Sequence, residues 1–161
     1  MKNKIYTLGT SNRSVEEFLE ILSHYQIEVV VDVRRWPTSK WFEHFKKENL
    51  EKILHENKVE YFHFEKLGGY REGGYKEYLK TKNFKEALKD LIKIFRSKKK
   101  NLAIVCAEKF PWKCHRFFVA HELEKLGFEV LHIIEKGRIW EMKKEPKEIK
   151  PFCEKKSLRK E

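Results

Sequence analysis

A chain of 161 residues is long enough for one domain with a core of its own, so it needs neither a disulfide nor a metal to fold. The net charge of +11 favours an anionic partner, with nucleic acid first. Charged residues make up 38% of the chain, mostly Lys and Glu, and this composition is also typical of the solvated surface of a thermophile protein. Both interpretations of the charge stay open.

The sequence predicts no membrane segment, because no run of about 18 apolar residues occurs. The N-terminus has no apolar stretch behind its charges, so it lacks the pattern of a signal peptide. We therefore expect a cytoplasmic protein, in which the three cysteines stay reduced.

Apolar residues recur along the chain in two patterns, short runs that predict strands and stripes at helical spacing that predict helices. Capping signals mark three helix ends: Ser14 with Glu17, Asn83 with Glu86, and Gly127. Short runs rich in β-branched residues predict strands at residues 5–8, 29–33, 59–64, 102–106 and 130–134. Apolar stripes at helical spacing predict helices at residues 14–25, 43–57, 83–96 and 114–126.

The alternation of strands and helices indicates an α/β fold. We expect a mostly parallel sheet of five strands, or slightly more, with helices on both faces in a Rossmann-like three-layer arrangement. Residues 1–140 are predicted to form a single domain. Residues 141–161, rich in Lys, Glu and Pro, are predicted to form a basic and partly mobile tail.

Polar side chains follow the predicted strands at the points where ligands bind in open parallel sheets, beyond the carboxyl ends. Because these ends meet at one edge of the sheet, we expect the side chains to converge there. The candidate catalytic residues are Asp32, Cys106, Glu108, Cys114 and His115. The candidate substrate-binding residues are Ser11, Asn12, Arg34, Arg35, Trp36, Tyr70, Arg71 and Arg116.

Asp32 follows three consecutive valines and is expected to be buried, so its carboxylate needs a partner such as Arg34 or Arg116. Two roles are open for it: a structural ion pair that holds two loops, or a general base or substrate-orienting acid. We predict no cofactor and no metal ligand, although Asp32 and Glu108 would allow a divalent cation.

The two cysteines near these residues also have two interpretations each. Cys106 ends an apolar strand, where cysteine is often a small core residue. Cys114 precedes a helix beside His115 and Arg116, and this position either lowers the pKa of the thiol or leaves it buried and inert. His115 and Arg116 at the same helix start are also suited to binding an anion.

Neither a zinc site nor a known thiolate loop is indicated by spacing. Cys106, Glu108, Cys114 and His115 have the right residue types for zinc, but their spacing does not match paired zinc knuckles. A phosphatase or rhodanese loop is disfavoured, because no glycine lies between Cys106 and Arg116. The sequence also has no dinucleotide-binding fingerprint and no phosphate-loop lysine motif.

Basic and aromatic side chains alternate in two aperiodic segments. One contains Arg35, Trp36 and Trp41, and the other contains Tyr70 and Arg71. Such residues bind nucleic acid through phosphate contacts and stacking on unpaired bases. The alternative is that the tryptophans pack their loop onto the body of the protein.

The order of five motifs resembles the family called domain of unknown function 488. These motifs are Tyr6–Asn12, Val31–Arg34, Leu67–Gly69, Cys106–Glu108 and Cys114–Arg116. The resemblance covers roughly residues 5–134, although members more often have His where this chain has Thr10. It implies a shared site that includes Asp32, Arg34, Glu108, Cys114, His115 and Arg116, and it brings no settled activity.

Three functions are consistent with these residues. The first is an enzyme that acts on nucleic acid by base excision, strand cleavage or base modification, with a pocket of carboxylate, Arg and His side chains at the edge of the sheet. The second is a cysteine-dependent enzyme that transfers sulfur or another group to a small molecule. The third is a non-enzymatic module that binds an anion. The sequence does not predict an oligomeric state.

Overall fold

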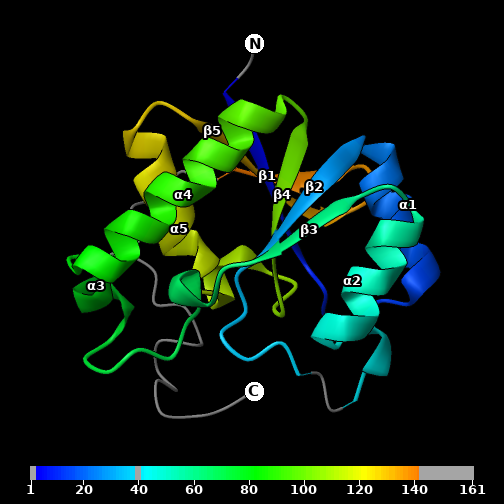
Figure 1. Cartoon of the computed structure of the whole chain (residues 1–161), viewed down its shortest axis with the longest axis horizontal. Coiled ribbons are helices and arrows are strands. Elements are labelled where there is room, and N and C mark those ends of the chain that lie inside the picture. The colour runs from blue at the N-terminus through cyan, green and yellow to red at the C-terminus, as the bar shows by residue number, and fades with distance from the viewer. Residues whose placement is uncertain (1–2, 39–40, 142–161) are drawn as a thin grey trace.

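The computed structural model describes residues 3–38 and 41–141 (Figure 1). The tail predicted from residue 141 onward lies, except for that residue, outside the described part. No helix in the described part is both long enough and apolar enough to cross a membrane.

The described residues form one six-stranded sheet with the order β3-β2-β4-β1-β5-β6. Its strands are β1 (Lys4–Gly9), β2 (Ile27–Asp32), β3 (Glu60–His63), β4 (Asn101–Cys106), β5 (Glu129–Glu135) and β6 (Arg138–Trp140). The first five are parallel, as the apolar runs predicted, and β6 pairs antiparallel with β5. The sequence did not predict β6, because a three-residue strand shows no period; Gly137, with φ of 82°, makes the tight turn into it.

Helices cover both faces of the sheet, so the predicted three layers are confirmed (Figure 1). One face packs against α1 and α2, and the other against α3, α4 and α5. The helices are α1 (Val15–His24), α2 (Lys47–Glu56), α3 (Tyr75–Tyr78), α4 (Lys82–Lys98) and α5 (Arg116–Lys125). Three 3₁₀ turns, η1 (Glu43–Phe45), η2 (Glu65–Leu67) and η3 (Pro111–Lys113), lie in the connections.

Side-chain caps explain where two helices begin. The Ser14 hydroxyl accepts a hydrogen bond from the Glu17 backbone N–H at 3.0 Å, which confirms the predicted start of α1. The cap of α4 is Thr81, not the predicted Asn83, because the Thr81 hydroxyl accepts from the Phe84 backbone N–H at 3.2 Å. The predicted helix over residues 43–57 is divided into η1 and α2, because Lys46 is extended (φ −62°, ψ 146°).

The register of the sheet decides which face each strand-end side chain points to. Asp32 pairs with Val105, so their side chains share the face that packs against α1 and α2. Cys106, the next residue on β4, therefore points to the opposite face and belongs to the core that contains α4 and α5. Two predicted catalytic residues at the same edge are thus separated by the thickness of the sheet.

Candidate functional site

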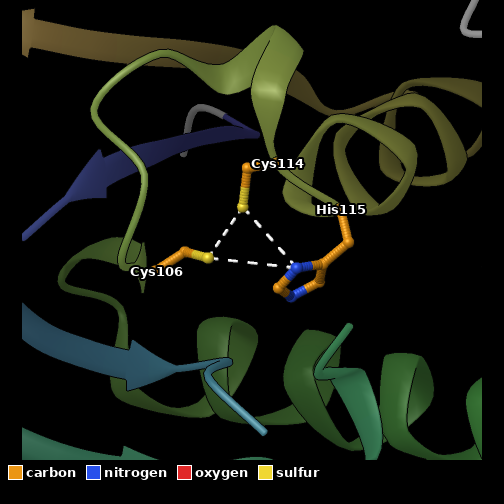
Figure 2. Close-up of side chains that lie close together, drawn as sticks. All are labelled: Cys106, Cys114 and His115. Carbon is orange, nitrogen blue, oxygen red and sulfur yellow. Dashed lines mark hydrogen bonds between the residues drawn. The ribbon is translucent and has the colours of Figure 1, made fainter. Parts of the chain in front are cut away.

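Three of the predicted catalytic residues, Cys106, Cys114 and His115, form what we call the Cys–His cluster (Figure 2). Cys106 is the last residue of β4, and the connection through η3 returns the chain so that Cys114 and His115 stand at the start of α5. The two Sγ atoms are 2.7 Å apart. His115 Nδ1 lies 3.9 Å from Cys106 Sγ and 3.6 Å from Cys114 Sγ. The two sulfurs and the imidazole nitrogen point toward one another, as Figure 2 shows.

The Cys–His cluster is buried, with Cys106, Cys114 and His115 exposed by 1%, 0% and 3%. Burial raises the pKa of the Cys106 thiol well above its ordinary value, and its hydrogen bond with Cys114 adds to the increase. A thiol with a raised pKa is protonated at neutral pH and is a poor nucleophile. The geometry therefore joins the two cysteines but does not activate Cys106.

The backbone around the cluster fixes the orientation of His115. Its Nε2 lies 3.0 Å from the Val33 carbonyl oxygen, which only accepts, so Nε2 carries the hydrogen and donates it. A neutral ring then directs the Nδ1 lone pair at the two sulfurs. Gly69 covers this nitrogen: a Cβ at residue 69 would lie 2.9 Å from Nδ1, so only glycine fits there.

Asp32 and Arg34 form a separate buried group on the other face. The Arg34 Nε and Nη2 donate to the two carboxylate oxygens of Asp32 at 2.9 and 2.8 Å, and the Tyr61 hydroxyl donates to Oδ2 at 2.6 Å. Burial lowers the pKa of Arg34, but the hydrogen bonds and charge of Asp32 outweigh it, and the net pKa is raised. Of the two roles open for Asp32, this fully bonded geometry is that of a structural ion pair.

Arg116 does not face Asp32, although the predicted pocket required it to. It donates to the backbone oxygens of Glu108 at 2.6 Å and Lys109 at 3.1 Å, and to the Thr7 hydroxyl at 3.0 Å. These bonds hold the connection after β4 against the end of β1, where a Cβ on Gly9 would lie 1.9 Å from the Glu108 oxygen. The guanidinium thus donates to backbone carbonyl oxygens that the backbone of this turn does not itself satisfy.

Glu108 is the other predicted carboxylate. Its side chain is half-buried and makes no hydrogen bond or ion pair with any residue in the described ranges. It therefore differs from Asp32, whose oxygens already accept bonds from Arg34 and Tyr61.

Arg35, Trp36 and Tyr70 form what we call the Arg35 stack, at the surface near the Cys–His cluster. The Arg35 guanidinium carbon lies 4.9 Å from the Trp36 ring centroid, and the Trp36 and Tyr70 rings are 5.8 Å apart at 32°. Arg35 Nη1 also donates to the Tyr70 carbonyl oxygen at 2.6 Å. Gly68 packs on the Arg35 backbone while Gly69 packs on His115, so two consecutive glycines separate the stack from the cluster.

The remaining predicted binding residues lie on neighbouring loops. Ser11, with φ of 48°, donates its backbone N–H to the Ala107 oxygen, and Asn12 beside it is exposed. Arg71 donates to the Gly68 carbonyl oxygen at 2.9 Å and pairs with Glu65 at 3.2 Å. These contacts fix the loops, and the Asn12 side chain stays at the surface.

Two residues that matter to these sites were given no site role by the sequence. Tyr61 completes the Asp32 group, and Gly69 makes room for His115. Tyr61 carries no local signal, because it is one of several aromatic residues in a strand. The glycine pair at 68–69 is a signal for close backbone approach, but it does not identify the partner.

The protein is thus an α/β protein with a mostly parallel sheet, which has a buried thiol–imidazole cluster and a partly exposed arginine–aromatic stack at its strand ends. The chain belongs to the domain of unknown function 488 family, since the family described as domain of unknown function DUF488 matches residues 14–123. The matched range contains both the Cys–His cluster and the Arg35 stack. No curated protein and no solved structure matches the chain.

Proposed function

We propose that this protein is an enzyme that acts on nucleic acid and holds an unpaired base on the Arg35 stack. The observation that carries the proposal is the stack itself: a guanidinium, an indole and a phenol ring in sequence, each partly exposed, at the carboxyl ends of parallel strands. Flat aromatic and guanidinium groups stack on bases whatever the base sequence. The net charge of +11 supports attraction of the phosphate backbone.

Glu108 is the proposed acid–base group of this enzyme. It is preferred over Asp32, because the Asp32 oxygens are already bonded to Arg34 and Tyr61, whereas Glu108 has no side-chain partner among the described residues. A carboxylate without a partner is able to take a proton from water or from a leaving group. The reactions that such a group would serve are base excision, strand cleavage and base modification.

Binding of fluorescent single-stranded oligonucleotides tests the stack. Trp36→Ala removes the central ring and is expected to weaken binding by about 1–3 kcal/mol, roughly 5- to 150-fold in Kd. Leu126→Ala is the control, because Leu126 is 58% exposed at the end of α5 and lies in neither of the two basic and aromatic segments. Binding should also weaken steeply between about 50 and 200 mM salt.

Equal losses for Trp36→Ala and Leu126→Ala, or no binding at low salt, would refute the proposal. For turnover, Glu108→Gln should retain affinity for lesion-bearing strands and lose product formation. If Glu108→Gln instead keeps full turnover, the carboxylate is not the acid–base group.

The convergence of Cys106, Cys114 and His115 favours a second candidate, a cysteine-dependent transfer of sulfur or another group. Burial and the raised pKa of Cys106 weigh against it, because transfer begins with an accessible thiolate. The anion-binding module is less supported, since the Arg34 and Arg116 guanidinium groups are both engaged within the fold.

A further inference from the structure

The Cys–His cluster contains three side chains that bind metals, and their donor atoms lie within 4.8 Å of one another. Two are sulfurs and one is an imidazole nitrogen, a donor set that zinc prefers. A lone cysteine at the end of a strand is an ordinary core residue. Two cysteines and a histidine, brought together from β4 and the start of α5 with their donor atoms aimed at a common point, are not explained by packing alone (Figure 2).

The hydrogen bond of His115 to the backbone is the arrangement that metal-binding histidines use. Nε2 donates to the Val33 carbonyl oxygen at 3.0 Å, which fixes the ring and leaves the Nδ1 lone pair directed at Cys106 and Cys114. In metal sites the nitrogen that does not bind the ion makes such a bond to a carbonyl or carboxylate. Val33, the residue directly after β2, supplies this support.

The two nitrogen–sulfur distances agree with this use, and the sulfur–sulfur distance is shorter than zinc requires. A tetrahedral ion with bonds of about 2.3 Å to sulfur and about 2.0 Å to nitrogen holds sulfur and nitrogen donors about 3.5 Å apart. His115 Nδ1 lies 3.6 and 3.9 Å from the two sulfurs. The sulfurs are 2.7 Å apart and would have to separate to about 3.8 Å when the ion binds.

Charge also favours a divalent ion here. An isolated thiolate in this space would be unfavourable, because the cluster is buried away from water. Two thiolates together with one Zn²⁺ and a neutral imidazole carry no net charge, so the complete site is compatible with burial.

We propose that Cys106 Sγ, Cys114 Sγ and His115 Nδ1 bind one zinc ion. Each thiol loses its proton to solvent as its Zn–S bond forms, His115 loses none, and no oxidant or reductant takes part. The fourth position of the ion is left to a ligand other than these three side chains, such as a water molecule. The site does not depend on the proposed function, because zinc binds there whether or not the Arg35 stack binds nucleic acid.

Zinc titration of the full chain, stripped with a chelator and kept reduced, tests the proposal. We expect one zinc per chain and the release of two protons, measured from the heat of binding in two buffers. As long as both thiols of the zinc-free chain are protonated, the apparent Kd should fall about 100-fold for each unit of rising pH, because two protons leave. Binding without proton release, or no binding tighter than that of the variants below, would overturn the site.

Variants identify the ligands. Cys106→Ser, Cys114→Ser and His115→Ala should each raise the Kd more than about 100-fold, since even loss of an outer partner of a ligand costs 10–100-fold. His55→Ala, which removes an exposed histidine on α2, is the matched control and should bind zinc as the original chain does. Equal affinity of His115→Ala and His55→Ala would show binding at surface histidines and refute the proposal.

Cobalt provides a readout that does not depend on whether the variants fold. Co²⁺ bound to the original chain should give sulfur-to-metal charge-transfer absorption in the near ultraviolet and tetrahedral bands in the visible. Zinc should displace both signals at one equivalent. A cobalt spectrum without the sulfur band, or a Cys106–Cys114 disulfide that persists in reductant and excludes zinc, would contradict coordination by the two thiols.

Discussion

The hydrogen-bond partners of Asp32 give this residue a structural role. Its oxygens accept from Arg34 Nε and Nη2, from the Arg34 backbone N–H and from Tyr61, and its side chain has no exposed surface. Arg34 continues the network by donating to the Phe45 carbonyl oxygen at 2.7 Å. The network connects β2 to β3 and to η1. Its loss should therefore lower the stability of the fold before it lowers activity.

Removal of the Asp32 charge tests this role. Asp32→Asn leaves the buried Arg34 guanidinium without its counter-ion, and we expect the free energy of unfolding to fall by about 3 kcal/mol or more. Urea denaturation measures the change. Asp90→Asn on the exposed face of α4 is the control and should stay within about 0.5 kcal/mol. A stable Asp32→Asn protein that has lost only its activity would assign Asp32 to catalysis instead.

At the scale of elements, β1, β5 and α5 are joined by a buried polar chain. The Thr7 hydroxyl accepts from Arg116 Nε at 3.0 Å and lies 2.6 Å from His132 Nδ1. His132 Nε2 has no hydrogen-bond partner among the described residues and lies in the core beside Trp140. Burial lowers the pKa of His132 well below 6.5, and the charge of Arg116 lowers it further.

The depressed pKa of His132 predicts a stability that depends on pH. Below about pH 6.5 the unfolded chain binds a proton at this histidine and the folded chain does not. The free energy of unfolding therefore decreases as the pH is lowered. The loss is about 1.4 kcal/mol per pH unit until the folded pKa is reached.

Replacement of the histidine isolates this contribution. His132→Leu should flatten the pH dependence between about pH 6.5 and 5 relative to the original chain, measured by urea denaturation at each pH. His55→Leu, at an exposed position on α2, should leave the slope unchanged. Identical slopes for the two variants would show that His132 is not the group responsible.

At the scale of the whole molecule, one sheet separates two apolar cores. Leu54 on α2 belongs to the core on one face, and Leu123 on α5 belongs to the core on the other. Both side chains are fully buried. Because the same strands contribute side chains to both cores, damage to either face should be transmitted through the sheet.

Core substitutions test whether the two faces unfold together. Leu54→Ala and Leu123→Ala should each lower the free energy of unfolding by about 2–5 kcal/mol, and circular dichroism and tryptophan fluorescence should report one coincident transition. Leu126→Ala, at a position 58% exposed beside the end of α5, should change it by less than about 0.5 kcal/mol. Two separate transitions in either core variant would show that the faces unfold independently.

Elements whose signal lies in neighbouring residues were predicted from the sequence. Five apolar runs became the parallel strands, and Ser14 started α1, because burial on two faces and helix capping act on neighbouring residues. Elements set by one or two residues, such as β6 and the extended Lys46, leave no periodic pattern and were missed. The strand-end rule also selected the edge of the sheet at which the polar residues gather.

Which of these residues lie in contact depends on how the strands and turns pack in three dimensions. The register of β2 on β4 sends Asp32 and Cys106 to opposite faces, and no short segment of sequence encodes that pairing. The turn through η3 brings Cys114 and His115 back to Cys106, whose separation along the chain gave no metal signature. Arg116 binds backbone oxygens rather than a carboxylate, because a buried guanidinium bonds to whatever acceptors the fold places beside it.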